Sequence, residues 1–257
     1  DFPVIAEGEL PVSFELPAET LKQIIDKTRF AISTEETRYY LNGVYMHVAQ
    51  SEDGPTLRCV ATDGHRLARI DAPLPPGAEA MPGVIVPRKT VTELRKLLDD
   101  DEAQIAVSVS ETKVRFATPT ITLTSKVIDG TFPDYTRVIP TGNDKLLLID
   151  RQQLLAAMQR ASILSNEKFR GVRLVLTPGM LKIICNNTEQ EEAQEELEVN
   201  YEASPLDVGF NIQYLLDVLT NMQVETLHFA FGEAGSSVLV SIPDNEHFKY
   251  IVMPMRI

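Results

Sequence analysis

The sequence lacks the features that mark disulfide-bonded, zinc-binding or membrane proteins. Its two cysteines, Cys59 and Cys185, lie far apart and match no zinc-binding spacing among the 257 residues. No apolar run approaches the roughly 18 residues of a membrane span, and no basic-then-apolar leader opens the chain. We therefore expect a soluble, cytoplasmic protein with buried, reduced cysteines, which folds without a disulfide or a metal.

Common catalytic motifs are also missing. The sequence contains no P-loop, dinucleotide-binding glycine motif, HExxH or GxSxG. Its four histidines are dispersed and none has a metal-ligand spacing to another histidine or to a cysteine, so neither a metal nor another cofactor is expected: His47, His65, His228 and His247. An acid–base pair of Asp63 and His65 is the enzymatic alternative, but Asp63-Gly64 is a tight-turn dipeptide between two expected strands, which favours a structural turn.

Acidic residues outnumber basic ones by 37 to 24, giving a net charge of −13. This excess argues against a simple nucleic-acid coat protein, although it leaves room for a basic surface on one face. The acidic run from Glu189 to Glu198 lacks the spaced Asp/Asn ligands and the turn glycine of a calcium loop. It predicts a solvated strand face instead.

Hydrophobic periodicity predicts four helices, over residues 17–32, 87–98, 151–163 and 211–222. Short β-branched runs between them predict antiparallel strands, which outnumber the helices. The order repeats, because the strand and helix at 12–21 resemble those at 146–154, and the strand at 83–86 resembles the one at 207–210. The offset of roughly 120 to 135 residues predicts two copies of one α+β domain, joined near residues 132–141.

The expected helices carry basic residues away from their apolar stripes: Lys22, Lys27, Arg29, Arg88, Lys89, Arg95, Lys96, Arg151 and Arg160. Such a basic face could present a positive track to a duplex backbone without reading its sequence. Ordinary solvated helix surface is the alternative interpretation.

Several segments, spread in order over nearly the whole chain, resemble one family: Arg38–Gly43, Ala61–Ala68, Phe132–Tyr135, Leu164–Arg173 and Val252–Ile257. They look like the bacterial replicative sliding clamp, the β subunit of DNA polymerase III. The resemblance implies an α+β fold, a tandem repeat of DNA-clamp domains that each have antiparallel sheets outside and two helices inside. It also implies a non-enzymatic processivity factor, a ring around duplex DNA that needs no cofactor.

In that family each protomer has three similar domains, and two protomers close head to tail as a homodimer. This sequence starts, at Asp1-Phe2-Pro3, where the linker into the second domain is expected. The resemblance therefore implies that residues 1–133 form the second (central) domain and residues 134–257 the third, C-terminal domain. The first domain is absent on this interpretation, and the fragment is not expected to close the usual ring.

The family binds its partners in a pocket that takes a short peptide resembling Gln-Leu-x-Leu-Phe. These partners are the polymerase III catalytic subunit, the clamp loader, other polymerases and repair proteins. An apolar groove rimmed by Arg and His suits aliphatic and aromatic anchors, and thioethers repack around many partners. The resemblance places the pocket at these positions: Leu41, Thr62, Gly64, His65, Arg66, Leu67, Pro133, Arg137, Val138, Asn211, Tyr214, Ser237, Ile251, Val252, Met253, Pro254, Met255 and Arg256.

For DNA, Arg38, Tyr39 and Tyr40 match a loop that projects toward the duplex in the family, and Arg88 and Lys89 are the next candidates. Glu35 stands where the family often has a neutral amide, which predicts a weakened contact. Two alternatives stay open at this point. One is a protein-binding scaffold that never meets DNA, and the other is a hydrolase that uses Asp63 and His65.

Overall fold

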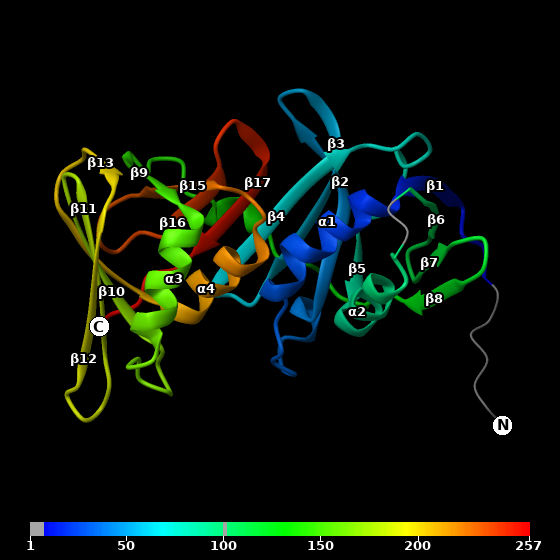
Figure 1. Ribbon diagram of the computed structural model, residues 1–257. Coiled ribbons are helices and arrows are strands. Elements are labelled where there is room, and N and C mark those ends of the chain that lie inside the picture. The colour runs from blue at the N-terminus through cyan, green and yellow to red at the C-terminus, as the bar shows by residue number, and fades with distance from the viewer. Residues whose placement is uncertain (1–7, 100–101) are drawn as a thin grey trace. The chain divides into compact units, whose positions relative to one another are not determined.

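The chain folds into two compact units, each described here by itself. A computed structural model describes residues 8–99 and 102–257, so the start of the chain at Asp1-Phe2-Pro3 lies outside the described residues. The first unit ends at Phe132 and the second begins at Pro133, except that the short segment Gly64–Ala68 belongs to the second unit. Figure 1 shows that each unit combines sheets with a pair of helices.

The first unit has two antiparallel sheets and two helices. One sheet has the strand order β1-β6-β7-β8, and the other strands follow the order β4-β3-β2-β5. The short 3₁₀ turns Arg29–Ala31 and Tyr39–Leu41 precede β2. The elements are β1 (Val12–Pro17), α1 (Ala18–Thr28), β2 (Gly43–Ser51), β3 (Gly54–Thr62), β4 (Arg66–Pro73), β5 (Val84–Pro87), α2 (Arg88–Lys96), β6 (Gln104–Val109), β7 (Lys113–Ala117) and β8 (Thr122–Lys126).

The second unit repeats this plan. Its strand orders are β12-β11-β10-β14 and β13-β9-β15-β16-β17, and a 3₁₀ turn over Tyr135–Val138 precedes them. As in the first unit, each helix directly follows a strand, so the predicted tandem repeat of α+β domains is confirmed. The elements are β9 (Lys145–Asp150), α3 (Arg151–Ser162), β10 (Gly171–Thr177), β11 (Met180–Asn186), β12 (Glu192–Glu198), β13 (Asn200–Tyr201), β14 (Leu206–Asn211), α4 (Ile212–Asn221), β15 (Thr226–Phe231), β16 (Val238–Ile242) and β17 (Asn245–Val252).

Each helix buries one apolar stripe against its own unit, as its periodicity predicts. In α1 the buried side chains include Leu21, Ile24 and Ile25, and in α4 they include Leu215 and Val218. The two helices of each unit pack together, α1 with α2 and α3 with α4 (Figure 1). The core of each unit therefore lies between this helix pair and the sheets.

All four predicted helices end before the expected residue, and side-chain hydrogen bonds accompany two of these ends. The first stops at Thr28, whose hydroxyl donates to the Ile24 carbonyl at 2.6 Å, and a 3₁₀ turn replaces its last residues. The third stops at Ser162 because the Ser165 hydroxyl takes up the Ser162 carbonyl at 2.7 Å. Ile163 is consequently 78% exposed rather than part of the apolar stripe.

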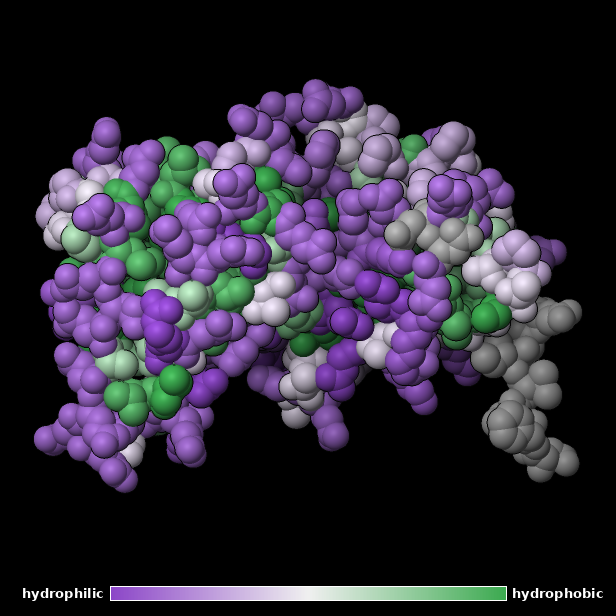
Figure 2. Space-filling model, in the orientation of Figure 1, coloured by the Kyte–Doolittle hydropathy of each residue, from purple (hydrophilic) through white to green (hydrophobic). Residues whose placement is uncertain are grey.

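Both cysteines are buried and unpaired, as predicted. Burial raises the pKa of the Cys59 thiol, and it raises that of Cys185 to about 11, so both remain protonated near neutral pH. No helix within residues 8–99 and 102–257 is long and apolar enough to cross a membrane. Figure 2 shows mostly hydrophilic residues on one face of the molecule, with hydrophobic atoms in scattered patches.

The acidic run forms a solvated strand, as predicted. Strand β12 lies at the edge of its sheet and pairs only with β11, and its residues alternate between exposed and half-buried. Glu195 receives a two-pronged ion pair from Arg160, with distances of 2.9 and 2.7 Å. Acidic side chains on an edge strand oppose pairing with a further strand.

Helix starts differ between the units. Helices α1 and α2 follow Pro17 and Pro87, which make no side-chain cap, whereas Asp150 caps α3 by accepting a hydrogen bond from the Gln153 N–H at 2.7 Å. The Asp150 carboxylate thereby satisfies one of the free N–H groups of the first turn.

Replacing Asp150 with alanine should lower the free energy of unfolding by about 1 kcal/mol, because the first turn of α3 loses its side-chain acceptor. Chemical denaturation followed by circular dichroism measures the change. Gln152→Ala, an exposed substitution in the same turn, should change it by less than about 0.5 kcal/mol. Equal effects of the two substitutions would contradict the assigned cap.

Candidate functional site

The segment Gly64–Leu67, which we call the β3–β4 segment, is positioned by contacts with other parts of the second unit, to which it belongs. Gly64 has a φ of +88°, which is why glycine suits the turn after Asp63. The Met253 N–H donates to the His65 carbonyl at 2.9 Å, and the His65 ring is roughly parallel to that of Tyr214, with 6.5 Å between centroids. The predicted Asp-Gly turn thus brings His65 beside α4 and the end of β17.

Arg66 fixes the β3–β4 segment through an ion pair with α4. Its Nη1 lies 2.5 Å from Asp217 Oδ2, and its guanidinium carbon lies 4.5 Å from the Tyr214 ring centroid. Burial lowers the pKa of Arg66, but Tyr250 and Asp217 outweigh that effect and raise it overall. The Arg66 side chain is only 10% exposed. Its charge is paired with Asp217 inside the unit.

Met253–Ile257, the terminal segment, follows the buried residues Ile251 and Val252 of β17. The Met255 N–H donates to the Gly209 carbonyl of β14 at 2.9 Å, in addition to the bond from Met253 to His65. Met253 remains 50% exposed, Pro254 and Met255 are half-buried, and Arg256 is exposed. The segment therefore presents two thioethers and a cation at the surface of the unit.

The remaining predicted pocket residues of the second unit occupy several places. Asn211 caps α4 by accepting from the Gln213 N–H at 2.9 Å. Ser237 precedes Val238, the register partner of Val252, so it lies beside the start of the terminal segment. Pro133 and Val138 are exposed near the 3₁₀ turn, where Arg137 pairs with Asp134 at 2.9 Å. The contacts thus join the β3–β4 segment, Tyr214 and the terminal segment directly, with Ser237 adjacent.

Leu41 and Thr62 belong to the first unit, where both are buried. Leu41 ends the 3₁₀ turn, and its carbonyl accepts from the Ser33 N–H at 3.1 Å. Thr62 is the last residue of β3.

The sequence did not predict the roles of Asp217 and Gln213. Gln213 donates to Asp217 Oδ1 at 2.8 Å, so a second α4 side chain orients the carboxylate that holds Arg66. A usable signal was present, since Asp217 is the one ionisable acid or base among Ile212–Asn221, apart from Tyr214, and a charge on an otherwise uncharged helix calls for a partner.

The DNA-contact candidates are partly neutralised within the chain. Arg38 makes a two-pronged pair with Glu35, with Nε 2.9 Å from Oε2 and Nη2 2.8 Å from Oε1. The hydrogen bond that Arg38 donates to Glu35 raises the pKa of Arg38. Tyr39 is 53% exposed, and its ring forms an edge-to-face contact with that of Tyr40, with 5.8 Å between the ring centroids. This loop therefore presents aromatic rings beside a cation that Glu35 already engages.

The predicted basic helical track is shorter than the sequence suggests. Arg95 pairs with Asp26 at 2.8 Å, Lys96 with Glu93 at 2.9 Å and Arg160 with Glu195. Arg151 donates to the carbonyls of Leu219 and Val224. Arg88 and Lys89, in the first turn of α2, are exposed and engage no acidic side chain among the described residues. They are the cations of α2 best placed to meet a phosphate.

Metal chemistry has no support in this geometry. No group of three or more His, Cys, Asp or Glu side chains that could hold a metal ion occurs in the part of the chain that the structure describes.

Comparisons with known proteins agree with the two-unit architecture. The family model for the central domain of the DNA polymerase III beta subunit matches residues 15–134. The family model for its C-terminal domain matches residues 136–256. The chain is 47% identical over 259 residues to the beta sliding clamp of Pseudomonas aeruginosa and 42% identical to that of Escherichia coli. In both comparisons the alignment covers 100% of this chain and 69% of the relative.

Solved structures give the same result. The sliding clamp of Bartonella birtlesii bound to griselimycin superposes with a TM-score of 0.96 at 44% identity, covering 100% of this chain and 70% of that one. The Caulobacter crescentus clamp also gives 0.96, at 46% identity, covering 100% and 68%.

The tandem units therefore define a DNA-clamp fold. More specifically, the chain belongs to the bacterial beta sliding clamp family, the β subunit of DNA polymerase III. This family consists of non-enzymatic processivity factors. The alternative of a hydrolase that uses Asp63 and His65 is therefore excluded.

Replacing Asp217 with alanine should destabilise the second unit by about 2 kcal/mol, because Arg66 loses its charged hydrogen-bond acceptor. Hydrogen exchange of residues 64–68 should accelerate together with this loss. Glu202→Ala, which removes an exposed carboxylate from the same unit, should leave both measurements unchanged. Unaltered hydrogen exchange at residues 64–68 in the Asp217 variant would show that Asp217 does not hold the β3–β4 segment in place.

Proposed function

We propose that this chain contributes to a sliding clamp that encircles duplex DNA and tethers replication and repair proteins through a peptide-binding pocket. The observation that carries the proposal is the assembly of the β3–β4 segment, Tyr214 and the terminal segment. These residues occupy positions that the family resemblance gives to the partner pocket. The clamp would act in the bacterial cytoplasm, where its DNA is found.

The chemistry of this assembly suits a short linear motif. Met253 and Tyr214 offer a thioether and an aromatic ring at or near the surface. Methionine adapts to side chains of different shape, which allows one pocket to take many related peptides. We infer that the partners are the polymerase III catalytic subunit, the clamp loader, other polymerases and repair proteins, each binding through its own motif.

The proposed ring needs more than these two units. We assign residues 1–133 to the central domain and residues 134–257 to the C-terminal domain, in a chain that spans 69% of the length of its relatives. The complete protein would then form a head-to-tail homodimer, as the resemblance implies. In such a ring, the closed topology keeps the clamp on DNA, so individual DNA contacts can stay weak.

A labelled Gln-Leu-x-Leu-Phe-type peptide should bind the protein with micromolar affinity, a free energy of about −8 kcal/mol. Fluorescence anisotropy measures the binding. A variant lacking Met253–Ile257 should lose it, because the terminal segment supplies the exposed thioethers.

Point variants separate the pocket from general effects of the truncation. Met253→Ala should weaken peptide binding several-fold, whereas Met180→Ala, a half-buried methionine at the start of β11, should not. If the folded wild-type protein does not bind the peptide, the pocket assignment is wrong and the scaffold alternative gains support.

Charge changes on the first unit test the DNA contact. Reversing Arg88 and Lys89 to glutamate should weaken low-salt binding of a duplex and reduce the slope of log K against log salt by about one for each lost phosphate contact. Glu35→Gln should strengthen binding, because it frees Arg38 from its carboxylate partner. Duplex anisotropy over a salt series measures both changes.

Glu36→Gln is the matched control, since Glu36 is exposed next to Glu35 and takes no part in the pair with Arg38. It changes the net charge equally and should have the smaller effect. A duplex affinity unaffected by all these substitutions would favour the protein-binding scaffold that does not meet DNA.

A further inference from the structure

The terminal segment rests on a position in β14 where only glycine fits. A Cβ atom at Gly209 would stand 2.5 Å from Cδ1 and Cγ1 of Ile257 and 2.6 Å from the Met255 carbonyl oxygen. These separations are far below an ordinary van der Waals contact. Adding a methyl group at residue 209 would therefore force both Ile257 and the Met255 main chain to move.

We propose that Gly209 and Ile257 are positioning residues of the peptide pocket, which seat the terminal segment on β14 and thereby set the places of Met253 and Met255. This inference rests on the proposed function, since it concerns the same pocket. It adds two residues that the family resemblance did not supply as pocket positions.

Main-chain contacts show how the position is transmitted. Two main-chain hydrogen bonds among the described residues hold the segment. The Met253 N–H donates to the His65 carbonyl, and the Met255 N–H donates to the Gly209 carbonyl. Pro254 lies between these two points, and its ring fixes φ near −65°. Because Pro254 can rotate only about ψ, a displacement at Met255 is passed in part to Met253.

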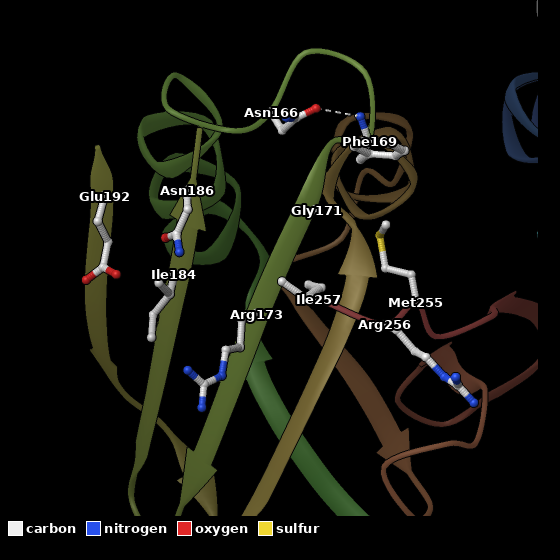
Figure 3. A pocket seen from close by; sticks show the side chains of 10 residues that line it. All are labelled: Asn166, Phe169, Gly171, Arg173, Ile184, Asn186, Glu192, Met255, Arg256 and Ile257. Atoms are coloured by element: carbon white, nitrogen blue, oxygen red, sulfur yellow. Dashed lines mark hydrogen bonds between the residues drawn. The ribbon is translucent and has the colours of Figure 1, made fainter. Parts of the chain in front are cut away.

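Ile257 acts through shape more than through burial. Its side chain is 67% exposed, so it contributes little hydrophobic free energy. Figure 3 shows Ile257 beside β10 near Gly171, while Arg256 points to the other side. The close approach of Ile257 to the glycine backbone is what fixes the direction of the segment.

A groove beside the segment gives it room to move when the seat is lost. The groove has a volume of about 380 Å³ and is lined by Phe169, Ile184, Met255 and Ile257 among others (Figure 3). A segment displaced by a methyl group at residue 209 can swing into this space without disturbing the buried core. The structural effect of the substitution should therefore be local.

Gly171 provides a matched control on the neighbouring strand. A Cβ atom there would lie 3.5 Å from Ile257 Cδ1, an ordinary contact, so Gly171→Ala adds the same methyl group beside the same side chain without a clash. Gly209→Ala and Gly171→Ala thus differ chiefly in whether the terminal segment must move.

The experiment combines two measurements on the wild-type protein, Gly209→Ala, Gly171→Ala and Ile257→Ala. Methyl NMR of ¹³C-labelled methionine reports the positions of Met253 and Met255 without any ligand, and anisotropy with the Gln-Leu-x-Leu-Phe-type peptide reports affinity. We expect Gly209→Ala to shift both methionine signals and to weaken the peptide about tenfold, or about 1.4 kcal/mol. Gly171→Ala should change neither measurement.

Ile257→Ala keeps the test decisive if Gly209→Ala fails to fold, because it alters only an exposed side chain. It should shift the Met255 signal and weaken the peptide several-fold. Unchanged methionine signals in the folded variants, or shifted signals with wild-type affinity, would overturn the inference. If the wild-type protein binds no peptide, the proposed pocket is wrong, and this inference fails with it. That outcome is distinct because no variant then differs from the wild type in affinity.

Discussion

The ion pair between Arg66 and Asp217 is the interaction on which the candidate site depends. It joins a segment between two strands to a helix about 150 positions later in the sequence, with a separation of 2.5 Å between Nη1 and Oδ2. An arginine with a 10% exposed side chain needs such a partner, because removing its charge from water is costly. Once Arg66 is held, the His65 carbonyl is placed to receive the Met253 N–H. The position of the terminal segment therefore depends in part on this charge pair.

Ion pairs within the chain reduce the positive charge that its helices present to the solvent. Several cations on the helices are engaged by carboxylates, as in the pairs Arg95–Asp26 and Arg160–Glu195, so they contribute little to a long-range positive field. Arg88 and Lys89 remain exposed at the start of α2. A clamp that slides benefits from few and weak phosphate contacts, because each strong contact would have to break at every step. The ion pairs are consistent with that requirement.

The two units share one plan but start their helices by different means. Proline residues precede α1 and α2, where a fixed φ near −58° presets the first turn, whereas Asp150 and Asn211 cap α3 and α4 through side-chain oxygens. Of these two devices, only the side-chain caps satisfy N–H groups of the first turn, whereas the first N–H groups of α1 and α2, those of Ala18 and Arg88, donate to the carbonyls of Ala103 and Asn42. Asn211 also lies two residues after Gly209, so the strand end that starts α4 also seats the terminal segment.

The sequence by itself determined the repeated α+β plan, the helix stripes of α1 and α4, the buried cysteines and the membership in a clamp family, because these depend on local periodicity and on contiguous motifs. Helix ends were less accessible, since Ser165 and Thr28 stop their helices through hydrogen bonds that periodicity does not encode. Only the tertiary structure decided that Arg66 pairs with Asp217, and that Glu35 engages Arg38. It alone revealed that Gly209 must be glycine. Burial and close approach between residues distant in sequence decide such roles, and no short stretch of the chain contains that information.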